Sequence, residues 1–395
     1  MSRRLVVGLG ALAVVIIGIL IALLVRTSAS PQPGPTPTTS ESANLRQSAF
    51  AVTVRDDTGN ITDGVVMGYD KPTSKATSLS LQPGLGVDIG NDGPVTLAEL
   101  GPQSPQTVDT QLSDQLGVRI AGGLIMDRLA FAGLVDAVGG VVVDVPAPII
   151  VEGSDGKDTV LAKAGRHRLY GPAAAAYVTV LLPGESQPAR MARFDNVWKQ
   201  VITTLPSNRD RLRTIVGSLG SSARMSIAPE VFGDFLADYQ SALIAKTVTS
   251  ANLPASGTGA GATELYTLTP VTAVPVITDL FGQALLVVGE DGALPRVRVV
   301  STGATVASLV QVKQELTSAK FVYVWGGSGA TVPTSNVYVP NPALTVPVGQ
   351  PVAGALGLPN NAVIVNKANT LGVDASVAAA ATILATPSST PSSSR

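Results

Sequence analysis

The chain has 395 residues, of which 45% are apolar, so it is long enough for two or three packed domains and disorder throughout is excluded. A formal net charge of -1, with only 14% charged residues, provides no basic field for a nucleic-acid backbone, and we expect no nucleic-acid partner. The absence of cysteine and the single histidine exclude disulfides, thiolate chemistry and multi-histidine metal sites. Carboxylates, hydroxyls and arginines remain for any chemistry. The Ala-, Val-, Leu- and Gly-rich composition is typical of a GC-rich bacterial genome.

An uninterrupted apolar run extends from Leu5 to Val25, which is long enough to cross a bilayer as a helix. Arg3 and Arg4 precede the run and Arg26 follows it, so the positive-inside rule predicts a cytoplasmic N-terminus, residues 1–4, and an exported remainder. A cleaved signal peptide is the alternative, but its apolar region should be shorter. The length favours an uncleaved signal anchor in the cell membrane.

A linker, residues 26–46, follows the anchor and contains PQPGPTPTTSES. This Pro/Thr/Ser-rich segment cannot bury a core and is expected to hold the exported part away from the bilayer as an extended spacer. A similar tail, TPSSTPSSSR at residues 386–395, ends the sequence and is predicted to be disordered.

Residues 47–289 alternate short Val/Ile-rich runs with longer helical runs, which predicts a layered α/β domain. Two polar turn sequences, DTGN and DKPTSK, connect the first three strand candidates and make them neighbours in the sheet. The expected strands are Phe50–Val54, Gly64–Tyr69, Ala76–Leu81 and Gly140–Val145. The expected helices are Thr107–Leu116, Leu129–Val138, Gly171–Val180, Met191–Leu205 and Pro229–Leu243.

Three segments in order carry a resemblance to a known family. LAFAGLVDAVGGVVVDVPAPI begins at Leu129, with Gly139 and Gly140 suited to a helix end at positive φ and VVVDV suited to a buried strand. AGRHRLYGPAAAAYV and ARMARFDNVWKQVI follow at the expected spacing. Together these segments resemble the LytR-CpsA-Psr (LCP) family.

The resemblance implies an α-β-α layered domain with a central mixed sheet. It also implies a membrane-anchored enzyme outside the cytoplasm that moves a glycopolymer from a polyprenyl-pyrophosphate carrier onto peptidoglycan. Arginines would clamp the pyrophosphate, a carboxylate-bound Mg²⁺ would offset leaving-group charge, and an apolar cavity between sheet and helices would hold the lipid.

The polar motifs of the family are poorly retained. The R-x-D motif falls on Ile61 and Asp63, so a candidate metal carboxylate remains without its arginine. The R-x-R motif after Tyr177 becomes Thr179 and Leu181. The I-P-R-D turn has become LQPGLG, without arginine or aspartate.

The R-x-x-R-Q helix survives as Arg190 and Arg193, with Phe194 in place of the amide. An acidic partner for Asp63 could be Asp56 or Asp57, although Arg55 lies nearer the expected position. Because most of the clamp is lost, the resemblance implies a degenerate member with no assigned catalytic residue, and with Mg²⁺ only if the residual site is active.

Each candidate also has a plain structural interpretation. Arg190 and Arg193 have the spacing of an exposed helix face, and we weigh this equally with a residual phosphate contact. Asp63 is favoured as a turn cap over a metal ligand, because a lone carboxylate holds Mg²⁺ weakly. His167 is expected to be exposed and Trp198 to lie in the core or a cavity wall.

A composition change after Gly289 marks a second, small α/β domain, residues 290–385, which resembles the LytR C-terminal domain and opens with VVSTGATVAS. Its expected elements are a strand at Arg296–Val300, a helix at Ala304–Ala319, strands at Lys320–Trp325 and Asn336–Val339, a helix at Val348–Leu356 and a strand at Ala362–Val365.

Three functions therefore stay open. The first is a non-catalytic lipid-binding or scaffold protein in cell-envelope assembly, with a polyprenyl-phosphate lipid, a cell-wall polymer or an envelope protein as partner. In that case Ile61, Leu181 and Phe194 would extend an apolar pocket toward its mouth. The second is an active glycopolymer transferase with a rearranged site, and the third is a structural spacer near the wall.

Overall fold

A six-stranded mixed sheet forms the centre of the first part of the chain, in the order β11-β6-β1-β2-β3-β12. The computed structural model describes residues 47–152, 158–182, 185–258, 264–290 and 292–384, all within one compact unit. Strands β1 to β3 are antiparallel neighbours, as the two polar turns predict, whereas β6 and β12 add parallel pairs. The strands are β1 Gln47–Arg55, β2 Ile61–Asp70, β3 Lys75–Leu81, β6 Gly122–Met126, β11 Ala223–Met225 and β12 Val248–Asn252.

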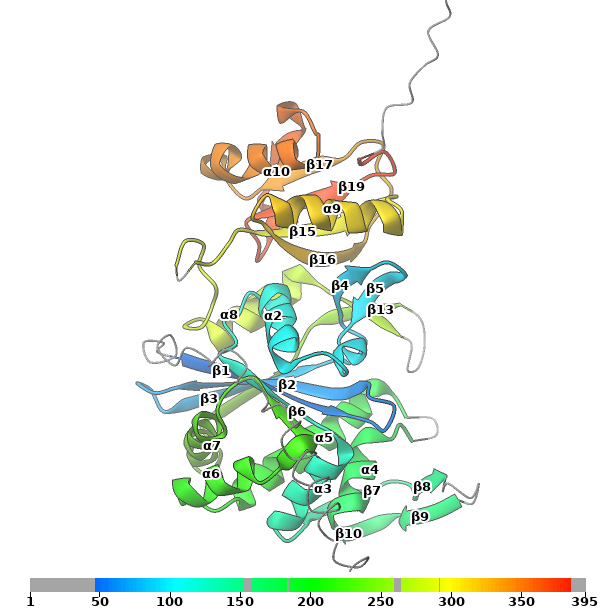
Figure 1. Ribbon diagram of the computed structural model, residues 1–395, viewed down its shortest axis with the longest axis vertical. Helices are drawn as coiled ribbons and strands as arrows, with labels where there is room; N and C mark the ends of the chain where they lie inside the picture. The colour runs from blue at the N-terminus through cyan, green and yellow to red at the C-terminus, as the bar shows by residue number, and fades with distance from the viewer. Residues whose placement is uncertain (1–46, 153–157, 183–184, 259–263, 291, 385–395) are drawn as a thin grey trace, which may run out of the picture. The chain divides into compact units, whose positions relative to one another are not determined.

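Helices cover both faces of this sheet (Figure 1). One face carries α3 Arg128–Ala137, α4 Gly171–Thr179, α5 Gln187–Thr204, α6 Arg209–Gly217 and α7 Pro229–Ile244. The other face carries α2 Pro105–Leu116 and α8 Pro270–Phe281, with the short turn η1 Ala98–Leu100. The predicted α-β-α layering around a central mixed sheet is therefore confirmed.

Strand alternation divides the apolar side chains between two cores. On β1, Phe50 and Val52 point to the core beneath α3 to α7, whereas Ala49 and Ala51 point to the core beneath α2 and α8. Successive side chains of a strand face opposite sides of the sheet, so a strand buried on both faces is apolar at almost every position.

The strand after the glycine pair is not a central core strand. Gly139 and Gly140 end α3 with φ of 75° and 84°, as expected, but β7 Val141–Val145 pairs only with β10 Gly165–Leu169 in a separate two-stranded ribbon. Asp144 is exposed, so the strand buries one face only. Three further ribbons complete this region: β4 Gly86–Gly90 with β5 Gly93–Thr96, β8 Ile149–Glu152 with β9 Asp158–Ala162, and β13 Ala255–Thr258 with β14 Leu265–Leu268.

A second sheet of five strands follows, in the order β16-β15-β19-β17-β18. The parallel pair of β15 and β16 is connected by α9, which is the predicted βαβ unit. Helices α9 Val306–Ser318 and α10 Gln350–Ala355 pack on one face of the sheet. The strands are β15 Arg296–Ser301, β16 Val322–Ser328, β17 Asn336–Val339, β18 Val363–Val365 and β19 Ala375–Ala379. The boundary at Gly289 and the resemblance to a LytR C-terminal domain stay predictions.

The predicted anchor at Leu5–Val25, the linker and the C-terminal tail lie outside the described residues. Among the residues that are described, no helix combines the length and the apolar character needed to cross a bilayer.

Candidate functional site

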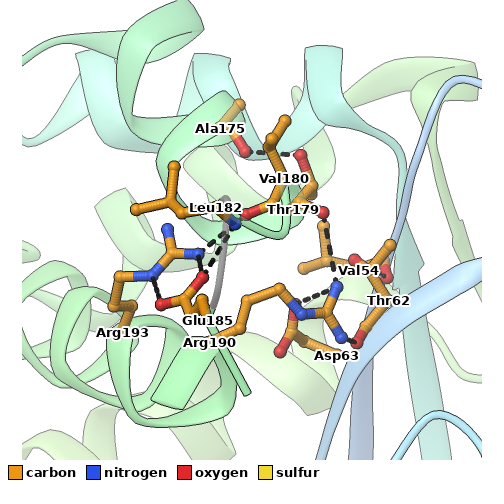
Figure 2. Close-up of polar contacts among 10 residues, drawn as sticks. All are labelled: Val54, Thr62, Asp63, Ala175, Thr179, Val180, Leu182, Glu185, Arg190 and Arg193. Atoms are coloured by element: carbon orange, nitrogen blue, oxygen red, sulfur yellow. Dashed lines mark hydrogen bonds and ion pairs between the residues drawn. The ribbon is translucent and has the colours of Figure 1, made fainter. Parts of the chain in front are cut away.

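Asp63, Arg190 and Arg193 meet between the central sheet and α5. Asp63 lies on β2 at the same strand parity as Val65 and Met67, both of which face the core beneath α3 to α7. Arg190 and Arg193 lie in the first two turns of α5, on the side of the helix that packs toward the sheet. The three side chains are 0%, 3% and 6% exposed. They therefore form a buried cluster, which Figure 2 shows.

Arg190 is bonded on several sides by the chain itself. Its Nη1 donates to the Thr179 carbonyl oxygen at 3.3 Å and lies 3.7 Å from Oδ2 of Asp63, and its Nη2 donates to the Thr62 carbonyl oxygen (Figure 2). Thr179 is the last residue of α4, where helix carbonyls lack an intrahelical partner and carry partial negative charge. The guanidinium thus connects the end of α4 to β2.

Asp63 is held less completely. The Thr62 hydroxyl donates to the Val54 carbonyl oxygen at 3.2 Å, and neither carboxylate oxygen of Asp63 accepts a hydrogen bond. Burial raises the pKa of Asp63 to about 6, with the Arg190 charge opposing that rise. Asp63 is therefore a desolvated carboxylate that has Arg190 as its ion-pair partner and is also within reach of the charges of Arg193 and Asp195.

Arg193 is bonded more fully than Arg190. Its Nε donates to Oε1 of Glu185 at 2.7 Å, and its Nη2 donates to Oε2 of Glu185 and, at 2.7 Å, to the Val180 carbonyl oxygen (Figure 2). The guanidinium carbon also lies 4.7 Å from the centre of the Tyr177 ring, a cation-π distance. Glu185 therefore occupies the planar fork that a phosphate would use.

Two structural interpretations from the sequence are wrong. Asp63 is not a turn cap, because β2 begins at Ile61 and Asp63 is inside the strand. Arg190 and Arg193 do not form an exposed helix face, because both pack against the sheet and the end of α4. A contact of the two arginines with phosphate stays a prediction.

The three apolar replacements do not gather at one place. Ile61 is buried in the core beneath α2 and α8, whereas Phe194 is buried in the core on the opposite face of the sheet. Leu181 is half-buried in the segment after α4. The expectation that they jointly extend one pocket is wrong for Ile61, because the irregular register between β1 and β2 at Arg55 accompanies its turn toward the other face.

Aromatic side chains occupy the layer in which the resemblance implies a lipid cavity. Phe194 stacks on Trp198 with ring centres 6.3 Å apart and contacts Phe131 at 6.2 Å. Phe50 and Phe235 lie 4.4 Å apart farther along the sheet. All five rings are at most 5% exposed, so Trp198 is a core residue as expected.

The donor set around Asp63 does not fit Mg²⁺, which needs several oxygen ligands in octahedral geometry. The nearest charge is the Arg190 guanidinium, and the described residues contain no cluster of three or more acids or histidines that could hold a metal ion. Asp195, which lies on α5 with Arg190, accepts a hydrogen bond from the Ser80 hydroxyl at 2.6 Å. The residues around Asp63 therefore do not fit a bound Mg²⁺ ion.

The other acidic candidates are engaged elsewhere. Asp56 caps its own turn by accepting from the Thr58 and Asn60 amides, and Asp57 pairs with Arg128. Within the described part of the chain, neither forms a hydrogen bond or an ion pair with Asp63 or with the two arginines. His167 is half-exposed and contacts the Ala164 carbonyl, so its expected exposure is only partly met.

Glu185 is the site residue that sequence analysis missed. It lies directly before Ser186, the N-cap of α5, where the positive end of the helix favours a carboxylate. An acidic residue just before the helix, eight residues before Arg193, is the feature of the sequence that could have predicted this ion pair.

The family is shown by comparison with known proteins. The LytR_cpsA_psr family model matches residues 61–274, which is more than half of the chain. The chain belongs to the LytR-CpsA-Psr family, which is known for attaching glycopolymers to the cell wall. No curated protein matches it.

Several solved structures are similar. Bacillus subtilis TagV is 17% identical, with coverage of 61% of this chain and 98% of that chain and a TM-score of 0.50. Protein gbs0355 from Streptococcus agalactiae is 15% identical, with coverage of 60% and 88% and a TM-score of 0.51. A structure of TagT bound to LIIa-WTA is 18% identical, with coverage of 60% and 91% and a TM-score of 0.46. At these identities the first two show a common fold.

Proposed function

We propose that this chain is a non-catalytic member of its family that acts as a scaffold in cell-envelope glycopolymer assembly. One observation carries the proposal: the two surviving arginines are buried, and the chain itself supplies each of them with acceptors. Arg190 binds two backbone carbonyls and lies beside Asp63, and Arg193 binds Glu185 and one backbone carbonyl. A transferase of this family needs such cations for the pyrophosphate, since they stabilise the charge that develops on the leaving group.

An incoming pyrophosphate would have to displace the chain's own acceptors. A hydrogen bond to a charged group contributes about 1.5–3 kcal/mol, and Arg193 makes two of them to Glu185. A pyrophosphate that took the place of Glu185 would also bring additional negative charge toward Asp63, whose pKa is already raised by burial. These costs support a structural role for the cluster.

Scaffolding is favoured over lipid carriage because of the aromatic layer. A polyprenyl chain would have to enter the space in which Phe131, Phe194 and Trp198 pack with little exposure. Core packing is dense, so a guest of that size would require these rings to move. Lipid binding is therefore an outcome to be tested and not part of the proposal.

The proposed location is the outer side of the cell membrane. The apolar run Leu5–Val25 would hold the N-terminus in the bilayer, and the Pro-rich linker would extend the folded part toward the wall. Protease added to intact spheroplasts should digest the folded part. Digestion only after lysis would reverse the proposed orientation.

An activity assay on the full-length chain tests the proposal. Purified protein is incubated with polyprenyl pyrophosphate and Mg²⁺, beside an active family member, and we expect no pyrophosphate cleavage above background. Asp63→Ala and the exposed-carboxylate control Asp92→Ala should then be indistinguishable from the parent. Turnover that Asp63→Ala abolishes and Asp92→Ala retains would refute the proposal.

The lipid question needs a separate measurement on the same protein. Native mass spectrometry of the chain purified from membranes should show no bound polyprenyl lipid, and added polyprenyl phosphate should not raise the melting temperature. A bound polyprenyl lipid would contradict the scaffold proposal and would indicate that the protein carries the lipid.

A further inference from the structure

The five-stranded sheet carries a row of polar side chains on the face opposite α9 and α10. Along β15, Val297 and Val299 enter the core beneath those helices, so Arg298 faces the other way. Arg298 pairs in register with Ser376 of β19, and Ser376 pairs in turn with Tyr338 of β17. Register neighbours on one face lie side by side, so a guanidinium and two hydroxyls form a row across three strands.

Arg298 is buried without a partner. It is 6% exposed, and among the described residues no hydrogen bond or ion pair reaches its guanidinium. Burial, and then the neighbouring charge of Arg296, lower the pKa of Arg298 to about 10, so it stays charged at neutral pH. A buried guanidinium almost always has an acceptor in a folded protein, and here the chain supplies none within the described residues.

Arg296, two residues earlier on the same strand, is also buried but has hydrogen-bond partners. Its guanidinium donates to the carbonyl oxygens of Asp114, Gln115 and Gly372. The fold therefore satisfies one buried arginine of β15 with backbone acceptors and leaves the next one open.

Arg298 lines a cavity of about 480 Å³ on this face of the sheet. Val300, Val332 and Ala378 give the cavity an apolar wall, and Ser376 and Tyr338 give it hydroxyls. The wall also includes Pro270 and Val271, the first two residues of α8, where the helix dipole favours an anion. Pro270 has no N–H, so Val271 supplies the backbone donor at this end.

A second polar group at the same cavity is also unsatisfied. The Thr302 hydroxyl is buried with no hydrogen-bond partner, and Thr302 lines the cavity with Arg298. A guanidinium that opens onto the cavity without a partner in the described chain, beside a buried hydroxyl without a hydrogen bond, indicates a binding site whose ligand supplies an acceptor.

We propose that this cavity binds a carboxylate attached to a small apolar group. One guanidinium beside one helix N-terminus matches a single negative charge, and the planar fork of arginine suits the two oxygens of a carboxylate. The valine and alanine wall takes the apolar group. The site is separate from the Asp63 cluster and does not depend on the scaffold function.

Isobutyrate is the test ligand, because it joins a carboxylate to an isopropyl group, and isobutyramide is its neutral match. Saturation-transfer NMR on the full-length protein should show saturable binding of isobutyrate, with a dissociation constant on the order of millimolar for so small a ligand. Isobutyramide should bind at least tenfold more weakly, because it lacks the charge.

Variants connect the binding to Arg298. Arg298→Met should weaken isobutyrate binding at least tenfold, and Arg298→Lys should weaken it less, since lysine keeps the charge but lacks the fork. The exposed arginine variant Arg211→Met should bind as the parent does. Ser376→Ala provides a milder change that should weaken binding severalfold if Arg298→Met fails to fold.

Three results would overturn the proposal. Equal binding of isobutyrate and isobutyramide would remove the charge requirement. Unchanged binding in Arg298→Lys and Ser376→Ala would place the ligand elsewhere. Tighter binding of inorganic phosphate than of isobutyrate would mean that the cavity is a phosphate site and not a carboxylate site.

Discussion

The helix α5 and the strand β15 both bury arginine, but they treat its charge in opposite ways. Arg190 and Arg193 on α5 are 3% and 6% exposed and donate to carbonyls at the end of α4 and to a carboxylate. Arg298 on β15 is also 6% exposed and has no bonded partner among the described residues. Burial alone therefore does not distinguish the two regions, whereas the presence or absence of an acceptor for the guanidinium does.

The difference follows from what each element places nearby. Helix α4 ends with carbonyls that lack intrahelical partners, and the segment before α5 adds Glu185, so α5 arginines find acceptors within the fold. The strand β15 lies inside a sheet whose backbone groups are paired with the neighbouring strands. Arg298 therefore faces a cavity lined by hydroxyls, the Asn369 amide and apolar side chains, with no carboxylate among these described residues. Substitutions that remove charge from each region should therefore differ in sign.

The largest expected effect is at Arg190. Arg190→Met leaves the Thr62 and Thr179 carbonyls without a donor and Asp63 without a cation in a buried site. Breaking a buried pair in this way costs about 3–5 kcal/mol of unfolding free energy. Urea unfolding measures the change, with exposed Arg211→Met as control. A loss below about 1 kcal/mol would mean that the Arg190 contacts are not structural.

The next largest effect is the coupling between Arg193 and Glu185. A double-mutant cycle with Arg193→Met and Glu185→Gln should give a coupling energy of about 2 kcal/mol, since two charge-assisted hydrogen bonds are lost together. The exposed pair of Arg209 and Asp238 is the matched control and should couple by less than about 1 kcal/mol. Equal coupling in the two pairs would contradict an internal fork at Arg193.

The sequence predicted the sheet better than the site. Short, nearly continuous apolar runs located β1 to β3, because a strand buried on both faces is apolar at almost every position. The prediction for the site was wrong at Asp63. A strand expected to begin at Gly64 leaves Asp63 in a turn, whereas β2 begins at Ile61 and contains Asp63.

The acceptors of the arginines were harder to foresee. The carbonyls of Thr179 and Val180 belong to the backbone, and no residue type marks them. The lack of a partner at Arg298 depends equally on the tertiary arrangement, although the RVRVVS alternation does place Arg298 opposite the valines.

Asp109 allows a similar test for a buried negative charge. Burial raises the pKa of Asp109 from 3.8 to about 7. Between pH 4 and pH 7 the native state therefore keeps a proton on Asp109 that the unfolded state has released, so the free energy of unfolding falls as the pH rises through this range. Between pH 5 and pH 7 the free energy of unfolding should fall by about 2 kcal/mol. Asp63 and Asp114, with pKa values raised to about 6, act in the same direction.

Asp109→Asn should flatten this dependence, because the amide carries no charge at any of these pH values. Urea unfolding at pH 5 and pH 7 gives the two slopes, and Asp92→Asn, at an exposed turn, should keep the parent slope. A parent protein that is more stable at pH 7 than at pH 5 would contradict the raised pKa values.

The smallest expected effect, and the only stabilising one, is at Arg298. Unlike Asp109, an arginine cannot neutralise itself by a proton exchange, so its buried charge costs free energy until a ligand pairs with it. Arg298→Met removes that charge and the repulsion from Arg296, and the methionine stem can follow the path of the arginine over Gly326. The unfolding free energy of the ligand-free protein should rise by about 1 kcal/mol, in contrast to the loss at Arg190. Thermal unfolding in a buffer without carboxylates measures it, since a bound anion would stabilise only the parent. A destabilised Arg298→Met with unchanged folding of Arg298→Lys would mean that the charge of Arg298 already has a partner, and the contrast between α5 and β15 would disappear.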